Sequence, residues 1–136
     1  MQEKRITVPC PTEEVEQMQL FEWARWASGK YPELEDMHHI PNGGGRSKSE
    51  AGRLKAMGVK KGVADIFLPC ARGGYHGMYI ELKRLRGGRV EPEQRGFLER
   101  RSAAGYYCVV CRGMEAARAE IVKYLEEEIC YDEKRT

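Results

Sequence analysis

The sequence has no long run of apolar residues, no internal repeat and no low-complexity tract. A helix that crosses a membrane needs about 20 mostly apolar residues, so we expect no membrane partner. The five cysteines are an odd number, and no secretory signal precedes them, which argues against a disulfide framework. These absences predict a cytoplasmic protein whose thiols are reduced.

At 136 residues the chain can build one ordinary core, so we expect a single domain over residues 1–136. Within it, about residues 1–11 are expected to form an N-terminal arm and residues 131–136 a tail. Hydrophobic residues make up 41% and charged residues 32%, which is typical of a folded protein and excludes a disordered one.

The net charge of +2 by itself indicates no nucleic-acid partner, but the charges are unevenly distributed. Residues 46–61 carry six basic side chains against one acid, and residues 83–101 carry seven against three. Residues 115–135 reverse this balance, with seven acids and four bases. A basic middle and an acidic end favour one face built for a polyanion; the alternative is an ordinary mixed-charge surface.

Apolar periodicity, caps and chain breakers predict the order helix, short element, strand, strand, helix, strand, helix. This is an α/β domain with a mixed central sheet flanked by helices. Thr12 is the expected cap of the first helix. Helices are expected at residues 13–28, 50–57, 93–103 and 114–129, and strands at residues 63–69, 78–83 and 106–111, with 38–40 as a short strand. The strand at 106–111 reads as buried, and the last helix has Ala116, Ala117, Ile121, Tyr124 and Leu125 on its inner side.

The chain is organised around residues 63–83, which read as a strand, a glycine-rich turn and a second strand. Glu81 and Lys83 lie two apart on the second strand and therefore project from the same face. A hairpin would bring Asp65 alongside them. Two carboxylates with an ammonium group suit a hard cation and a water nucleophile. The alternative is a surface hairpin in which Glu81 and Lys83 form a weak ion pair in water.

Three other sequence patterns give weaker support for a redox, metal-binding or phosphate-binding role. The Cys108–Cys111 spacing fits a redox or half-zinc motif, but no second such pair exists and two core cysteines are the better interpretation. Adjacent His38 and His39 would face opposite sides of a strand, so a surface role or a phosphate contact is favoured over a shared metal. The glycine-rich loop at 41–46 lacks the lysine and serine or threonine of a phosphate-binding P-loop.

Taken together, the motifs resemble the VRR-NUC family of the PD-(D/E)xK nuclease superfamily, and especially its small stand-alone phage and bacterial members. The matching segments are GVADIFLP around Asp65, YIELK up to Lys83, and PEQRGFLERRSAAGY from Pro92 to Tyr106. Asp65 and Glu81 are 16 residues apart. One departure is Ala64, which stands where the superfamily has a proline. The resemblance implies a restriction-endonuclease-like core, and a host-cell cytoplasm if a phage or prophage encodes the protein.

The resemblance also implies a site. Mg²⁺, with Mn²⁺ as a substitute, would be held by Asp65, Glu81 and the backbone carbonyl of Leu82. Lys83 would orient or deprotonate the attacking water, and Gln94 would hydrogen-bond water or phosphate. The family's first-helix glutamate corresponds to Glu13 or Glu16, and the match at Gln17 and Leu20 favours Glu13. A structural alternative for these acids is that they complement the dipole of the first helix turn.

The activity implied is phosphodiester hydrolysis of DNA by a structure-selective endonuclease, similar to Holliday-junction resolvases and acting as a homodimer. A non-catalytic DNA-binding accessory module of phage replication or packaging is the alternative, and 136 residues leave little room for a restriction-type enzyme. Basic side chains are expected to contact the DNA backbone without reading its sequence. They are Arg46, Lys48, Arg53, Lys55, Lys60, Lys61, Arg84, Arg86 and Arg89.

Overall fold

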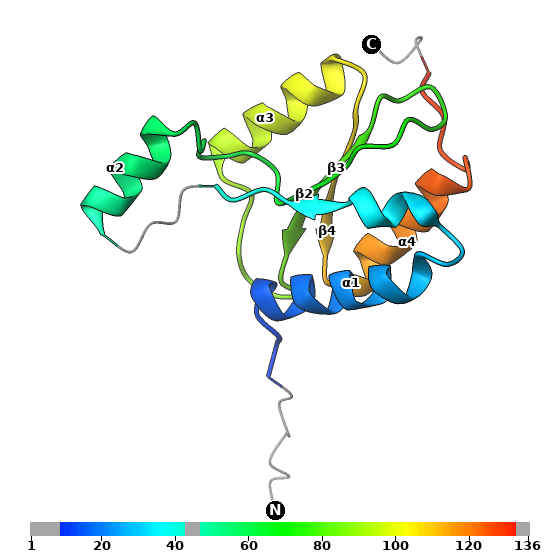
Figure 1. Ribbon diagram of the computed structural model, residues 1–136, viewed down its shortest axis with the longest axis horizontal. Helices are drawn as coiled ribbons and strands as arrows, with labels where there is room; N and C mark the ends of the chain where they lie inside the picture. Colours follow the sequence, from blue (N-terminus) through cyan, green and yellow to red (C-terminus); the bar gives the residue numbers. More distant parts are fainter. Residues whose placement is uncertain (1–8, 43–46, 133–136) are drawn as a thin grey trace, which may run out of the picture.

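A computed structural model describes residues 9–42 and 47–132 (Figure 1). Most of the expected arm, most of the expected tail and the candidate DNA contact Arg46 lie outside these ranges. Across the described part of the chain, no helix is both long enough and apolar enough to cross a membrane. In order, the elements are α1 (Glu13–Ala27), the 3₁₀ helix η1 (Pro32–Asp36), β1 (His38–His39), α2 (Lys48–Ala56), β2 (Ile66–Leu68), β3 (Met78–Lys83), α3 (Pro92–Ala103), β4 (Tyr107–Arg112) and α4 (Met114–Leu125).

The four strands form one mixed sheet in the order β1-β2-β3-β4. The first two pairings are antiparallel, with Ile66 opposite Ile80, and β3 pairs with β4 in parallel, with Lys83 opposite Arg112. A loop of nine residues suffices between β2 and β3, whereas the parallel step needs a crossover, which α3 provides. The prediction of an α/β domain with a mixed sheet and of a hairpin at its centre is therefore confirmed.

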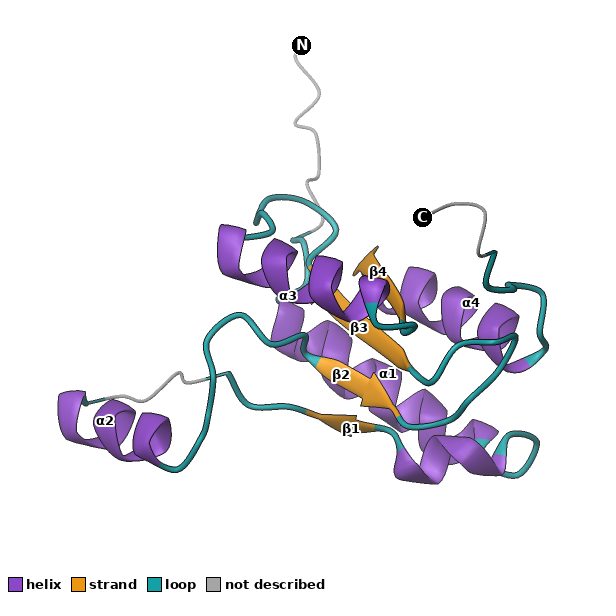
Figure 2. Cartoon of the chain, turned by 90° about the horizontal axis from the view of Figure 1, so that it is seen from above, coloured by secondary structure: helices purple, strands orange, loops and turns teal. Residues whose placement is uncertain are grey.

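Helices cover both faces of the sheet (Figure 1; Figure 2). Helices α1 and α4 pack together and against β3 on one face, where Leu20, Ile80, Ile121 and Tyr124 form part of the buried core. Helix α3 packs over β4 on the other face. Both views show α2 projecting away from the sheet.

Helices α1, α2 and α3 each begin at the residue that follows their N-terminal cap. The Thr12 hydroxyl accepts a hydrogen bond from the Val15 amide (3.2 Å), as the sequence predicted for α1. The Ser47 hydroxyl accepts one from the Glu50 amide (3.1 Å), so α2 begins at Lys48, two residues before the expected start. Helix α3 begins at Pro92, whose missing N–H costs nothing in a first turn.

Two features of the C-terminal part differ from the sequence-based predictions. Strand β4 is an edge strand in which Cys111 is buried but Val110 is 40% exposed, because only β3 flanks it. Helix α4 ends at Leu125 and not at residue 129, where Glu127 adopts a positive φ of 58°. Ala116 on this helix is exposed and is not part of the inner face.

The cysteines agree with the sequence-based prediction, whereas the start of the expected tail does not. All five cysteines are free, as the odd count indicated, and Cys108 is only partly buried. Tyr131, expected to begin a frayed tail, is instead held: its amide donates to the Gly73 carbonyl (2.8 Å) and its ring packs edge-on against Tyr75 at 5.5 Å. The ring contact explains the difference, since it removes apolar surface from water.

Candidate active site

The alternation of side chains along β3 positions the central acid and lysine. Met78, Ile80 and Leu82 point into the core, and the intervening side chains therefore face α3. Glu81 is 1% exposed and Lys83 is 6% exposed. The alternative interpretation, a solvated surface pair, is wrong because neither side chain is at the surface.

Gln94 links the acid to the lysine. Its amide nitrogen donates to Glu81 Oε1 (2.9 Å), and its amide oxygen accepts a hydrogen bond from Lys83 Nζ (3.2 Å). Lys83 Nζ also lies 3.6 Å from Glu81 Oε1. The Gln94 oxygen additionally accepts from the Glu91 amide (2.8 Å), which completes a capping box at the start of α3. The helix cap therefore fixes the rotamer that orients both charged groups.

Asp65 reaches the same place from just before β2. Its Oδ2 accepts a hydrogen bond from the backbone amide of Leu82 (2.8 Å), so its carboxylate lies beside β3 where β2 no longer pairs with it. Because the N–H and C=O of one strand residue point to the same strand edge, the Leu82 carbonyl faces this edge too. The Asp65 carbonyl accepts from the Ile40 amide (2.8 Å), which ties this segment to the end of β1.

The electrostatics of Glu81 reflect this crowding. Burial raises its pKa to about 8, the neighbouring Asp65 carboxylate adds to the increase, and Lys83 opposes it. Asp65 and Glu81 are close enough to share a hydrogen bond when one of them carries a proton. Glu81 Oε2 is buried and finds no hydrogen-bond partner among the described residues. Two adjacent carboxyls with an unsatisfied oxygen are a poor arrangement for two anions and a good one for a cation.

The structure separates the two first-helix acids. Glu13 lines a pocket of about 420 Å³ together with Asp65, Leu82 and His39. Glu16 is 5% exposed and its Oε2 accepts a hydrogen bond from the Met114 amide (2.6 Å). Glu16 therefore satisfies an N-terminal amide of α4, where no residue at the N-cap does so. Of the two, Glu13 is the one that the fold places beside the Asp65 carboxylate.

The chemistry of the donor set fits a hard divalent cation. Among the described residues, no group of three or more His, Cys, Asp or Glu side chains is arranged to hold a metal ion. Asp65, Glu81 and the Leu82 carbonyl offer oxygen only, and Mg²⁺ is commonly bound by one or two carboxylates with water completing its shell. The unsatisfied Glu81 Oε2 is the specific feature that such an ion would satisfy.

The basic side chains form two groups around this site. Five exposed lysines and arginines lie on α2 and the segment that follows it: Lys48, Arg53, Lys55, Lys60 and Lys61. Lys55, Lys60 and Lys61 line a second pocket, of about 550 Å³, that reaches Gln94. The other group lies between β3 and α3. There Arg84 is half-buried, Arg86 and Arg89 are exposed, and Arg89 Nε is 3.3 Å from Glu91 Oε1.

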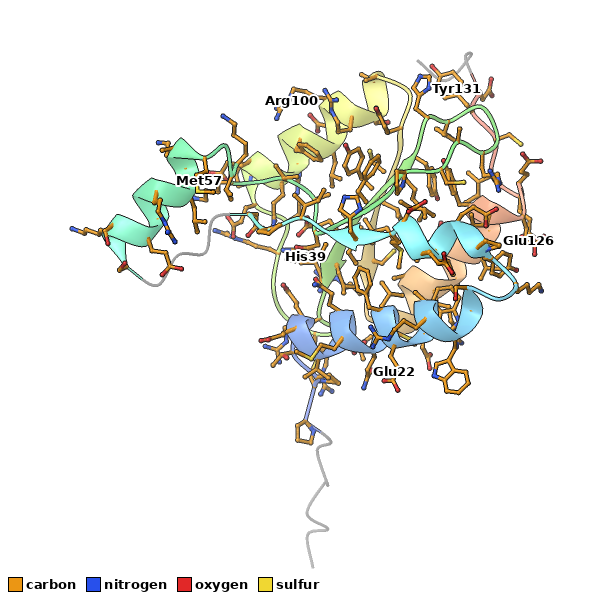
Figure 3. All side chains as sticks on the ribbon, in the orientation of Figure 1. Glu22, His39, Met57, Arg100, Glu126 and Tyr131 are labelled. Atoms are coloured by element: carbon orange, nitrogen blue, oxygen red, sulfur yellow. The ribbon has the colours of Figure 1, made fainter. Side chains whose placement is uncertain are left out.

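Two residues near the site make contacts that sequence reasoning did not predict. Arg112 donates to the carbonyls of Arg84 (3.0 Å), Gly87 (2.8 Å) and Gly88 (3.2 Å), and so braces the loop after Lys83. Its place at the end of the strand parallel to β3 was the available signal. His39, labelled in Figure 3, is exposed as expected, and its Nδ1 also lies 2.7 Å from the Asp65 carbonyl while its side chain lines the Glu13 pocket.

The mixed sheet flanked by helices, with acids and a lysine at one strand end, defines a restriction-endonuclease-like fold. The VRR-NUC domain model matches residues 12–115. A solved structure described as a VRR-NUC domain protein is similar over 91% of this chain and 95% of its own, with 30% identity and a TM-score of 0.75. No curated protein matches the chain. The chain belongs to the VRR-NUC family, which is a family of nucleases.

Proposed function

We propose that this protein is a metal-dependent, structure-selective DNA endonuclease that hydrolyses phosphodiester bonds and resembles Holliday-junction resolvases. The observation that supports it most directly is the meeting of Asp65 and Glu81 at the edge of β3, beside the buried Lys83 and Gln94. Mg²⁺, or Mn²⁺ in its place, would be held by Asp65, Glu81 and the Leu82 carbonyl. When bound, it would supply a water of lowered pKa and positive charge for a phosphate oxygen.

The chain's own groups then have separate tasks. Glu81 and Asp65 supply the negative charge that concentrates cations at this strand end. Lys83 Nζ carries the positive charge nearest to Glu81 and would orient the attacking water or stabilise the extra charge on the phosphate. Gln94 holds Lys83 and Glu81 in one geometry, and Glu13 faces the pocket beside Asp65.

The substrate assignment rests on charge and on symmetry. Lys55, Lys60 and Lys61 line the pocket that reaches Gln94, and a second basic group lies on the loop after β3, so a phosphate backbone could contact both groups. A four-way junction needs two symmetric nicks, and a two-fold homodimer supplies two sites in the required relation. We therefore propose branched DNA as the substrate and a homodimer as the active form.

A cleavage assay with labelled four-way, flap, splayed and duplex DNA tests this assignment. The wild type should cut branched DNA in Mg²⁺ or Mn²⁺ and stop in EDTA. Lys83→Ala should retain binding and lose cleavage by about 100-fold or more, the scale of a lost general base or charge-stabilising group. Lys123→Ala, which removes an exposed lysine of α4, is the matched control and should cut normally.

Three outcomes would contradict the proposal. Wild-type cleavage by Lys83→Ala would remove Lys83 from the mechanism. Equal cleavage of duplex and branched DNA would remove structure selectivity. Junction binding without cleavage under any divalent cation would instead assign the chain as a DNA-binding accessory module. Sedimentation of the protein with and without junction DNA decides the oligomeric state.

A further inference from the structure

The sheet face that carries the candidate active site also carries a cluster of aromatic rings. Phe67 and Tyr79 are stacked, with ring centroids 4.4 Å apart and an interplanar angle of 19°. Tyr106 lies 5.3 Å from Tyr79 and 6.2 Å from Phe67. We call these three residues the aromatic platform. Each is partly exposed, and none belongs to the buried core cluster or to the residues packed against it.

Strand alternation ties the platform to the catalytic candidates. Tyr79 is two residues before Glu81 on β3, so its ring lies on the same side of that strand as the carboxylate, and Phe67 is paired with Tyr79 across β2 and β3. Two residues of strand span roughly 7 Å. That is about two steps of a stacked nucleic-acid strand at about 3.4 Å each. The platform is therefore within one or two nucleotides of a phosphate at the active site.

The border of the platform is polar and carries cations. The Arg101 guanidinium lies over the Tyr106 ring at 5.9 Å and over the Phe97 ring at 6.0 Å. The exposed rings of His38 and His76 meet Phe67 and Tyr106 edge-on at 5.8 and 5.7 Å. Aromatic faces beside arginine are the combination with which proteins hold single-stranded nucleic acid, because every base has a face to stack.

Helix α3 covers only part of this face. Phe97 of α3 meets Tyr79 edge-on at 5.2 Å, and α3 packs along β4, whereas β1 and β2 extend beyond it in both views (Figure 1; Figure 2). Phe67 and His38 belong to those two strands. The platform is thus continuous with the candidate active site, and each of its three rings stays partly exposed.

We propose that the aromatic platform stacks an unpaired nucleobase of the DNA next to the phosphate held at Asp65 and Glu81. This inference rests on the proposed nuclease function and refines its substrate class. Bases within a perfect duplex are already stacked and cannot use the platform. The enzyme therefore prefers branched DNA, whose nucleotides at the branch can become unpaired, over a continuous duplex.

Fluorescence of 2-aminopurine tests the proposal in EDTA, where binding is measured without cleavage. The probe is placed at unpaired positions one to three nucleotides from the branch of a splayed substrate, and in a duplex for comparison. Stacking should quench the probe in the splayed substrate. Phe67→Leu should abolish this quenching and weaken splayed-DNA binding about five-fold or more, with duplex binding unchanged, because stacking on an aromatic ring contributes about 1–3 kcal/mol per base.

Matched variants separate stacking from a general loss of structure. Phe67→Tyr keeps an aromatic face and should restore quenching and affinity. Phe21→Leu makes the same change at a partly buried ring of α1 that packs against the core on the opposite face, and it should leave DNA binding unchanged. Circular dichroism of each variant establishes that it is folded.

Several results of these experiments would overturn the stacking proposal. Absence of quenching with the wild type, or equal weakening of splayed and duplex binding by Phe67→Leu, overturns the proposal; the wild-type result decides alone if the variant does not fold. A change in sedimentation of Phe67→Leu without a change in quenching would make this face a contact between two copies and overturns it as well. Quenching without cleavage by the wild type in any divalent cation would refute the nuclease assignment while the platform stands.

Discussion

Metal binding by this protein should be strongly pH-dependent, because the Glu81 carboxyl holds a proton that a cation must displace. Burial and the Asp65 carboxylate raise the Glu81 pKa from 4.5 to about 8. Metal ligands bind in their deprotonated form, so each pH unit below that pKa weakens binding about tenfold. Relative to pH 9, Mn²⁺ affinity should be about tenfold lower at pH 7 and about 100-fold lower at pH 6.

The raised pKa of Glu81 also determines whether the free energy of unfolding rises or falls with pH. Unfolded Glu81 loses its proton near its ordinary pKa of 4.5, whereas the folded protein keeps it up to about 8. Between those values the folded state binds the extra proton, so the metal-free protein loses stability as pH rises through this window. A bound divalent cation should reverse this trend, since it stabilises the ionised pair.

Isothermal titration with Mn²⁺ in buffers of different ionisation enthalpy measures the proton released per ion. About one proton should be released at pH 6–7 and none above pH 9. Asp65→Asn removes the charge that helps to raise the Glu81 pKa, so proton release near pH 7 should fall. Glu22→Gln removes an exposed carboxylate from α1 and should change neither quantity (Figure 3). Mn²⁺ affinity that stays constant from pH 6 to pH 9 would refute the reasoning.

Two further predictions concern residues that support the site. Glu16→Ala should lower the free energy of unfolding in urea by about 1–3 kcal/mol, since it leaves the half-buried Met114 amide of α4 without its acceptor, and the exposed Glu14→Ala should change it by less than about 0.5 kcal/mol. Equal effects of the two substitutions would contradict the capping role. Arg112→Ala should speed tryptic cleavage after Arg84 and Arg86 several-fold, because three carbonyl contacts of that loop are lost, whereas the exposed Arg118→Ala should not. Mass spectrometry of the digest locates the cuts, and unchanged cleavage after Arg86 would argue against the brace.

The sequence was most informative where local rules act alone. Thr12 caps α1, Pro92 opens α3, and alternation along residues 78–83 correctly placed Glu81 and Lys83 on one face of the strand. Predictions were wrong where an element's neighbours decide. The apolar run of β4 has the composition of a buried strand, but a strand at a sheet edge has one partner and keeps Val110 exposed. The prediction for α4 failed for a different, local reason: the helix ends at Leu125 because the run of acids that follows is unfavourable at a helix C-terminus.

For the candidate active site, too, the sequence predicted what depends on a short stretch and missed what depends on long-range contacts. Spacing along the chain was enough to single out Asp65, Glu81 and Lys83, because a hairpin brings them together, whereas Gln94 was expected only from the resemblance to the VRR-NUC family. It could not choose between Glu13 and Glu16, which differ by three residues on one helix. That choice depended on what each reaches across the fold: Glu16 meets the Met114 amide of α4, and Glu13 faces the pocket of Asp65.

By itself, then, the sequence determined the kinds of element, their order and the residue types that carry the chemistry, since propensity, caps and side-chain alternation act over a few residues. Only the tertiary structure decided which of those groups lose their water and which meet. The raised pKa of Glu81, the double contact of Gln94 and the neighbouring aromatic platform all arise from residues that are distant in the chain. Burial and long-range contact depend on the packing of the whole domain, which no short stretch of sequence specifies.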